Sequence, residues 1–590
     1  MSLTRKAASP NPRGMPARLS LALLIAGVLS APALAGDGQA TSLLKSLAGA
    51  PGSRAMPQPV GPRRIHPART VAPRPAGTVV VTNCDDAGPG SLRDAVENAV
   101  SGDVVDLTAL SCSTISLATG ALATDVDDLT VDGPGPEALA IDAAGSSRIF
   151  DHGGTGTLTL NGLALRNGSY TSTDFTGPGF AQGGCAYSAG RLVANDVHAS
   201  GCRVDGATAE GAAFWAWTSL DLTDSKVTAA VANAHSDTLS SVVFGGTLFG
   251  FLGMNLVRTE VTDSTSTSAT NLNPSGNSIT TINGGVIWTG QSVAITDSVI
   301  TGAFASASSP NALAWVKGGS VYAANGAAIT NTTIANSSLS APAGTSYDYQ
   351  TLVLGAGVYI AGSGSPTTIT GSTITGNYAH CNGSGDCDNE YTAVAGGALA
   401  SRVPVTLVNS TISGNASQKS GGGIVGIAFA SITLANSTIT GNSAPTAPGI
   451  FDNGIYVSTP LVTNSSIVAG NTGFGPDPAL NTDVVSVHTV TGANNLIGGA
   501  NVDLPADTLG GDPMLGPLAD NGGPTQTHAL LPGSPAIDHG NNLAGLAVDQ
   551  RGGSYVRAYG NGVDIGAFEL QPGPVTDRIF GDGFELAGRR

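Results

Sequence analysis

Aromatic side chains recur at one position of a repeated segment, and they are the residues of this chain best suited to contact a ligand. Each repeat contains a glycine-led motif, and the aromatic residue stands four positions after its first glycine. Flat rings with polar edges suit the apolar faces of sugars or an apolar partner. The pattern therefore indicates a binding strip made by Tyr187, Trp215, Phe249, Trp288, Tyr322 and Tyr359.

The residue before each aromatic is apolar in every repeat, as at Phe214, Ile287 and Val358. Neighbouring side chains of a strand point to opposite faces, so the apolar column predicts the core side and the aromatic column points outward. At about 4.8 Å between stacked strands, six rings would form a strip of roughly 24 Å. A self-stacking ladder covered by a loop or by residues 36–77 is the alternative, and the sequence leaves both open.

Carboxylates and histidines are scattered, and they give no catalytic assignment. A glycoside hydrolase needs two carboxylates at a controlled separation, whereas the acids within residues 125–128 and 386–390 are interpreted as turn or solvated groups. No C-x-x-C motif occurs, so we assign no metal site and no cofactor. Loose Ca2+ binding by acidic loops stays open, without a ligand set that can be named. Four histidines are interpreted as packed or turn residues, namely His198, His380, His528 and His539.

The composition excludes several classes of protein. The chain has 590 residues, of which 82 are glycine, and 11% are charged. Ordinary globular domains carry about 25% charged residues, many of them on exposed helix faces. The low charged fraction therefore argues against a helical, α/β or coiled-coil protein, and we expect an all-β protein. The net charge of -17 makes an acidic body that repels nucleic acid, so we expect no nucleic-acid partner.

The N-terminus has the features of an export signal. Arg13 and Arg18 precede an apolar run at residues 19–29, and an A-x-A cleavage site follows at residues 33–35. We expect a signal peptide over residues 1–35 and a disordered linker rich in Pro and Arg over residues 36–77. No other stretch approaches 18 apolar residues, so no transmembrane helix is expected in the mature chain.

Six cysteines suit an oxidising destination, because disulfides persist in exported proteins. They form three pairs that are local in the sequence, and we expect each pair to be bridged. The pairs are Cys84 with Cys112, Cys185 with Cys202, and Cys381 with Cys387.

Internal repeats predict the fold. A motif such as LVNSTISGN at residues 407–415 recurs, with Ile374, Ile412 and Ile439 at equivalent positions. The glycine-led motif alternates with it, at spacings from 25 residues (396 to 421) to 41 residues (355 to 396). One repeat is too short to bury its own apolar side, but stacked repeats pair strand on strand and bury a continuous core. The repeats therefore predict a parallel β-helix over residues 78–475.

The start of this region resembles a known group of proteins. Residues 82–96 (TNCDDAGPGSLRDAV) and 129–135 (LTVDGPG) resemble the entry segment and first coils of secreted, right-handed β-helix proteins of the pectin-lyase-like class. Ser91 would cap a helix over residues 92–100 that closes the end of the core. Enzymes of this class use Arg or Lys against acidic sugars. Residues 228–550 hold only four such cations, which argues against a uronate lyase: Arg258, Lys317, Arg402 and Lys419.

Residues 476–570 resemble the choice-of-anchor Q domain, through segments such as 520–528 (DNGGPTQTH), 549–552 (DQRG) and 563–569 (VDIGAFE). This family implies a secreted or surface-attached bacterial protein, without a defined reaction. Five polar residues of these segments are interpreted as ties within a C-terminal cap: His528, Asp538, Arg551, Asp564 and Glu569. Residues 571–590 form a tail that is similar to the IFxDGFE endings of some secreted proteins.

These observations lead to an expected function. We expect a monomeric protein that is secreted or attached to the outer membrane or cell surface. It would act by binding, in the manner of an adhesin, to a glycan or a cell-surface ligand. A polysaccharide-active enzyme and a purely structural stalk are the alternatives. Exposed aromatic and charged residues clustered on one face would favour binding.

Overall fold

The computed structural model describes residues 74–571 apart from residues 176–178, 238–239, 271–278, 309–312, 345–349, 363, 383–386, 388–391, 428–429, 445–454, 458–459, 474–481 and 487. The expected signal peptide, the linker up to residue 73 and the tail from residue 572 lie outside the described residues.

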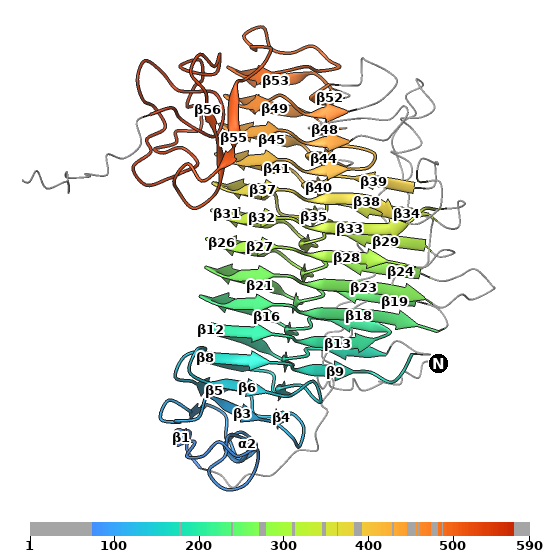
Figure 1. The fold of residues 1–590 in the computed structure, drawn as a ribbon, viewed down its shortest axis with the longest axis vertical. Helices are drawn as coiled ribbons and strands as arrows, with labels where there is room; N and C mark the ends of the chain where they lie inside the picture. The colour runs from blue at the N-terminus through green and yellow to red at the C-terminus, as the bar shows by residue number, and fades with distance from the viewer. Residues whose placement is uncertain are drawn as a thin grey trace, which may run out of the picture.

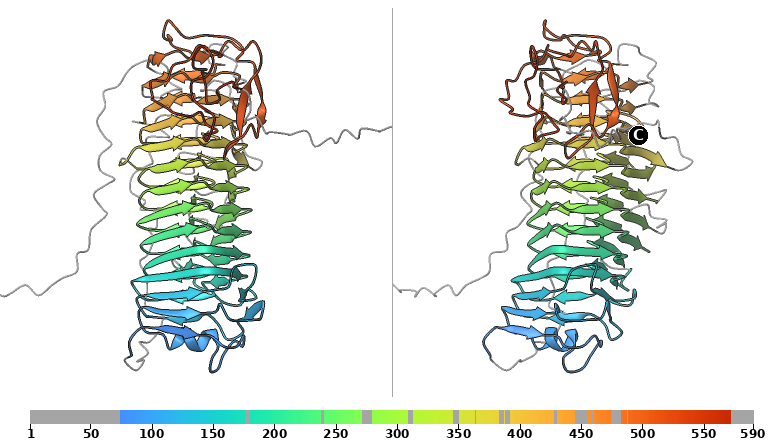
Figure 2. Two further views of the ribbon diagram at one scale, coloured as in Figure 1. Left: turned by 90° about the vertical axis from the view of Figure 1, so that its left-hand side faces the viewer. Right: turned by 60° about the vertical axis from the view of Figure 1, so that its left-hand side comes forward.

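The described chain winds into a right-handed parallel β-helix whose coils stack along one long axis (Figure 1). One coil contains β21 (Gly253–Val257), β22 (Glu260–Thr262), β23 (Thr265–Thr270), β24 (Ile279–Asn283) and β25 (Ile287–Thr289). The first two strands of a coil join a 25-stranded sheet, and the others join sheets of 10, 7 and 12 strands. Each strand pairs in parallel with its equivalent in the next coil, as β22 does with β27 (Val299–Thr301), so the expected fold is confirmed (Figure 2).

The predicted isoleucine column lies in the core. Ile374 of β37 (Thr373–Thr375) pairs with Ile412 of β42 (Thr411–Ser413), and Ile412 pairs with Ile439 of β46 (Thr438–Thr440). All three side chains are buried. Like residues therefore stack on like residues, which is the register that the repeated motif predicts.

An asparagine ladder fixes the same register at the bend after these strands. The side-chain amide of Asn377 donates to Asn415, that of Asn415 to Asn442, and that of Asn442 to Asn471, each at 2.9 Å. Asn471 in turn donates to Asp483 at 3.0 Å, and burial raises the pKa of this terminal acid. Because a buried amide without partners costs free energy, a slip by one residue would leave the ladder unsatisfied.

A short helix, α2 (Leu92–Glu97), closes the N-terminal end of the core (Figure 1). The Ser91 hydroxyl accepts a hydrogen bond from the backbone N–H of Asp94, which is the expected N-cap. Leu92 and Val96 are buried against the first coils. The helix ends before residue 100, because Asn98 caps it with bonds to Asp94.

The solenoid extends further than the sequence predicts. Parallel pairing continues past residue 475 through β52 (Val484–Ser486), β53 (Val490–Ala493) and β54 (Leu496–Ile497). The predicted boundary is therefore one coil too early, because this coil lacks the repeated motif but keeps its inward apolar residues, such as Val490. The C-terminal region that follows, residues 498–571, contains an antiparallel pair, β55 (Leu515–Ala519) with β56 (Thr527–Leu530).

The C-terminal region lies beside the last coils, against the outer face of the 25-stranded sheet (Figure 2). Gln550 accepts a hydrogen bond from the Thr411 hydroxyl at 2.6 Å and donates to Thr373 at 2.9 Å. The imidazole of His528 bonds the Ser413 hydroxyl at 2.7 Å. Residues of the repeated motif therefore serve as the docking surface of the cap.

All three predicted disulfides are present: Cys84–Cys112, Cys185–Cys202 and Cys381–Cys387. Such bonds suit an extracellular environment. In the described part of the chain, no helix has both the length and the apolar content that crossing a membrane requires.

Candidate functional site

The glycine-led motifs form a sharp turn between two sheets. At Gly245 the backbone φ is +51°, and a Cβ atom there would lie 2.2 Å from the carbonyl oxygen of Leu248. Only glycine adopts this turn without strain. In the next coil Gly284, with φ of +72°, joins β24 of the 7-stranded sheet to β25 of the 12-stranded sheet. The outer faces of these two sheets therefore meet, and we call their junction the corner.

The predicted aromatic column lies in the corner, and its register is confirmed. Tyr187 pairs with Trp215, Trp215 with Phe249, and Phe249 with Trp288. Tyr322 and Tyr359 continue the column. Consecutive rings stack with centroids 4.7, 5.3, 4.7, 6.4 and 5.5 Å apart. The six rings therefore form one ladder along the solenoid.

The expected exposure of this ladder is wrong. Trp215 and Phe249 have no accessible surface, Trp288 keeps 6%, and only Tyr322 is half-buried. The side chains do point away from the coil core, as alternation predicts. The glycine turn, however, folds the 7-stranded sheet over them, and Phe244 of that sheet meets Trp288 edge-on at 5.4 Å. The ladder belongs to a second apolar core outside the coils, so it offers no exposed strip.

One titratable carboxyl is buried against the ladder. Glu210 of β14 (Thr208–Glu210) accepts hydrogen bonds from Trp215 Nε1 and Gln182 Nε2, both at 2.8 Å and both on Oε2. Its other oxygen has no partner among the described residues. Burial raises the pKa of Glu210 to about 7. A second acid, Asp151, continues the ladder column in the preceding coil, and it forms an ion pair with Arg148 at 3.0 Å.

Two exposed aromatic residues that the repeat analysis missed lie on the 10-stranded sheet. Phe304 of β28 (Phe304–Ala307) is 44% exposed, and Tyr378 of β38 (Tyr378–Asn382) is 39% exposed. Both occupy one column, with Ser338 of β33 (Ser338–Pro342) between them. The signal that reveals them is this shared strand position, which becomes visible once the strands are aligned coil by coil.

Polar side chains adjoin these rings on the same sheet. Asn382 donates its amide to the hydroxyls of Ser340 at 2.9 Å and Ser306 at 3.2 Å. His380 stacks on Tyr378 with centroids 4.5 Å apart, and its Nδ1 has no hydrogen-bond partner in the described chain. Burial lowers the pKa of His380, so its imidazole is neutral at physiological pH. We call this surface the outer aromatic face, formed by Phe304, Ser306, Ser340, Tyr378, His380 and Asn382.

A shallow depression of about 310 Å³ lies on the 25-stranded sheet near the first coils, and it is lined in part by Arg166, His198 and Lys226. Lys226 already pairs with Glu260 at 3.0 Å, and His198 lies 3.3 Å from Glu137. His198 and Lys226 therefore already face carboxylates, and Arg166 is the one cation of the depression without an ion pair to a described acid.

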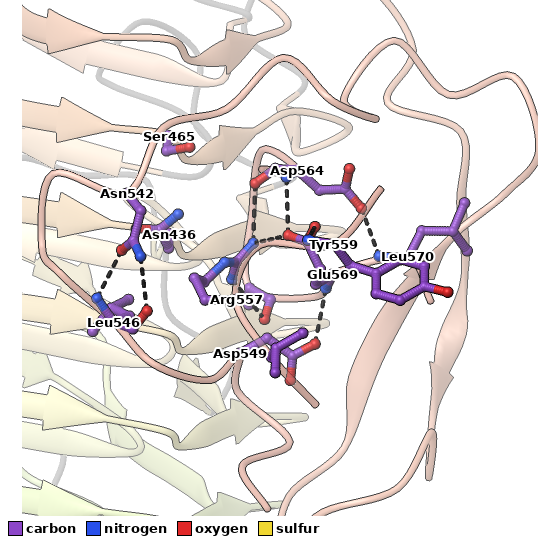
Figure 3. Close-up of polar contacts among 12 residues, drawn as sticks. Asn436, Ser465, Asn542, Leu546, Asp549, Arg557, Tyr559, Asp564, Glu569 and Leu570 are labelled. Atoms are coloured by element: carbon purple, nitrogen blue, oxygen red, sulfur yellow. Dashed lines mark hydrogen bonds and ion pairs between the residues drawn. The ribbon is translucent and has the colours of Figure 1, made fainter. Parts of the chain in front are cut away.

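The charged residues of the C-terminal region form a buried network rather than an accessible site (Figure 3). Arg557 has no accessible surface, and it donates to the Asp564 carbonyl at 3.0 Å and to the Glu569 carboxylate at 3.3 Å. Arg551 pairs with Asp549 at 2.6 Å. Burial raises the pKa of Glu569 to about 7. These contacts are the structural ties that the sequence predicts for this region.

Within the described residues, no group of three or more His, Cys, Asp or Glu side chains is arranged to hold a metal ion. We compared the chain with family models, with curated proteins and with solved structures, and none of them matches it. The resemblances to the pectin-lyase-like and choice-of-anchor Q groups therefore depend on the quoted motifs.

Proposed function

We propose that this protein is exported and acts by binding a glycan at a cell or matrix surface, with the outer aromatic face as its contact surface. The observation that carries the proposal is the pair of exposed rings, Phe304 and Tyr378, on one column of a rigid sheet. A contiguous exposed apolar patch marks an interaction site more often than a single exposed residue does, and here two rings share one column of the sheet.

The spacing of the rings suits a linear sugar chain. Phe304 and Tyr378 are separated by two strand spacings, or about 10 Å along the solenoid. This separation is close to the length of two linked pyranose rings in an extended chain. Each aromatic face can cover the apolar face of one sugar, and the small Ser338 between them leaves the intervening space open.

The polar members of the face supply hydrogen bonds. The Asn382 amide holds the Ser306 and Ser340 hydroxyls in place. Ser340 is buried, whereas Ser306 and Asn382 are half-buried and are oriented before a ligand binds. The Nδ1 atom of His380 is buried, so the imidazole contributes its ring, stacked beside Tyr378, rather than an exposed hydrogen-bonding atom. Rings with adjacent hydroxyl, amide and imidazole groups are typical of glycan recognition rather than of an inert stalk.

Export is supported by the three disulfides and by the resemblance of both ends of the described chain to secreted proteins. The signal-like segment at residues 1–35 has the length and composition that export requires.

The experiment is a co-sedimentation assay of the mature protein with insoluble glycans such as cellulose, chitin and xylan, and with bacterial cells. The double variant Phe304→Ser/Tyr378→Ser should weaken binding by roughly tenfold or more. Its melting temperature should stay close to that of the wild type, since both rings are exposed.

The matched control is Leu252→Ser/Val299→Ser, which removes two apolar side chains that are exposed elsewhere on the coils, at 54% and 40%. This variant should bind as the wild type does. If the ring variant binds equally well, the face is not the contact surface. If the wild type binds neither glycans nor cells, the stalk alternative is favoured.

A further inference from the structure

Two cations in the corner face no carboxylate. Lys317 of β29 (Leu313–Lys317) and Arg402, just after β40 (Leu399–Ser401), form no ion pair with any described acid. We propose that they form a second binding site, for an oxyanion carried by a hydroxyl-bearing ligand such as a sugar sulfate or a sugar acid. This site lies on sheets other than that of the outer aromatic face, so either proposal can fail while the other stands.

The two cations both lie near the ring of Tyr359. The Lys317 ammonium lies 5.1 Å from the centre of the Trp315 ring and 5.9 Å from that of Tyr359. The Arg402 charge partly offsets the effect of burial on the pKa of Tyr359, and it helps to lower the pKa of Lys317, after the larger effect of burial. Burial also raises the pKa values of Tyr322 and Tyr359. Both phenols are therefore neutral at physiological pH and cannot serve as counter-ions.

Most described cations of this chain, which has 42 acidic and 25 basic residues, pair with a carboxylate. Besides Lys317 and Arg402, Arg166 forms no ion pair with a described acid, and Lys419 donates to the Thr392 carbonyl at 2.8 Å. A half-buried cation without an anion loses hydration without compensation. Nine other described Lys or Arg side chains pair with carboxylates: Arg74, Arg93, Arg148, Arg191, Arg203, Lys226, Arg258, Arg551 and Arg557. An external oxyanion at Lys317 and Arg402 would supply the charge that the chain itself provides elsewhere.

Neutral polar groups next to Lys317 are also unsatisfied. Thr281 and Asn283 of β24 lie directly across from Trp315 and Lys317 of β29. The Thr281 hydroxyl, the Asn283 side-chain oxygen and the Trp315 indole nitrogen have no hydrogen-bond partner among the described residues, although all three side chains are at least 94% buried. A buried polar group without a partner costs free energy, so each one is a position that a ligand can satisfy.

The mixture of groups selects the class of ligand. Lys317, Arg402 and Trp315 donate hydrogen bonds, and an oxyanion would accept them. The Asn283 oxygen needs a donor instead, which a simple sulfate ion lacks and a sugar hydroxyl supplies. The neighbouring Tyr322 and Tyr359 rings can contact the apolar face of the same sugar. An anionic sugar therefore satisfies more of the site than an inorganic anion or a neutral sugar does.

The first test uses the wild-type protein and its reactive lysines. Because burial lowers the pKa of Lys317 to about 8, this amine reacts readily with an acylating reagent. Lys226, which pairs with Glu260, is an internal reference on the same molecule. Saturating glucose 6-sulfate or N-acetylneuraminate should slow acylation of Lys317 several-fold and leave Lys226 unchanged, as measured by peptide mass spectrometry. The two probes distinguish a sulfate from a carboxylate source.

Glucose and inorganic sulfate are the comparison ligands, and both should protect Lys317 less than the anionic sugars. Failure of both anionic sugars to protect Lys317 would overturn the proposal. Equal protection by inorganic sulfate would overturn its hydroxyl-bearing part.

The second test compares variants by calorimetric titration with the anionic sugar that protects best. Lys317→Met should weaken binding by about tenfold or more, as expected when a hydrogen bond to a charged group is lost. Lys317→Arg keeps the charge and should retain most of the affinity, and Lys226→Met is the control for the loss of one cation. Unchanged binding by Lys317→Met would contradict the assignment. Should Lys317→Met fail to fold, the acylation result on the wild type decides.

Discussion

The Trp215 indole donates a hydrogen bond to the Glu210 carboxylate at 2.8 Å, and this bond joins the outer faces of two sheets. Trp215 belongs to the 12-stranded sheet and Glu210 to the 7-stranded sheet. Both side chains have no accessible surface. A buried indole N–H needs an acceptor, and here the acceptor is an acid whose desolvation disfavours its own charge. The contact thus makes the stability of the corner depend on pH.

Glu210 should make the protein less stable as pH rises from about 4.5 to 7. Burial raises its pKa from 4.5 to about 7, so in this window the folded chain holds a proton that the unfolded chain releases. The stabilisation is fully present below pH 4.5 and lost above pH 7, and it amounts to at most about 3 kcal/mol. Glu210→Gln, which resembles the protonated acid, should raise the melting temperature above pH 7 and flatten its pH dependence.

Glu260→Gln is the control for Glu210→Gln, because it removes the same charge from a half-exposed position on the coils. It should leave the pH dependence of melting nearly unchanged. Glu569, whose pKa burial also raises, contributes in the same direction, so some pH dependence should persist in Glu210→Gln. An unchanged pH profile in Glu210→Gln would show that Glu210 is ionised in the folded state.

The aromatic ladder should be a stability element. Trp288→Ala removes a ring that stacks on Phe249 at 4.7 Å and meets Phe244 at 5.4 Å. We expect a loss of about 3–5 kcal/mol in the free energy of unfolding, measured by chemical denaturation. Phe304→Ala, at an exposed ring, should cost far less. Equal losses for the two variants would contradict the burial of the ladder.

The isoleucine column should be sensitive to both size and charge. Ile412→Ala should cost about 2–5 kcal/mol because it opens a cavity between Ile374 and Ile439. Ile412→Asp should disrupt the neighbouring coils, since its carboxylate has no polar partner in the core. Hydrogen exchange, read coil by coil, would locate the disruption. Melting of Ile412→Asp at the wild-type temperature would refute the register.

The buried network of the C-terminal region should depend on Arg557. Arg557→Met leaves the Glu569 carboxylate without its buried cation and the Asp564 carbonyl without a donor, and such a loss costs about 3–5 kcal/mol. The cost should be smaller at pH 6 than at pH 8, because Glu569 takes up a proton near pH 7. Limited proteolysis would report release of the region. Arg203→Met, in an exposed ion pair, is the control and should change little.

Local repetition explains which parts of the fold are predictable. The repeated motif places its isoleucine inward in each coil. Ile374, Ile412 and Ile439 are therefore identified as core residues from the motif alone, without any distant contact. The asparagine at the following bend is likewise predictable, because Asn415 bonds the equivalent Asn442 one coil away. The limit of the solenoid was harder to predict, since the coil around Val490 keeps the inward pattern but not the motif.

The candidate sites depend on contacts that repetition does not encode. Trp215 and Tyr378 both point away from the coil core, and their strand patterns do not distinguish them. Likewise, no sequence spacing shows that Lys317 and Arg402 flank the same ring, Tyr359. Strand alternation by itself therefore predicts direction but not exposure.

The sequence alone determined the stacked coils, the inward columns and the disulfide pairs, because each follows from short-range spacing repeated along the chain. Only the tertiary structure decided which outward columns meet solvent. The turn at glycines such as Gly245 folds one sheet onto the next and covers the ladder, whereas Phe304 and Tyr378 stay exposed. Exposure is set by the angle between sheets, and that angle results from packing between residues far apart in the sequence.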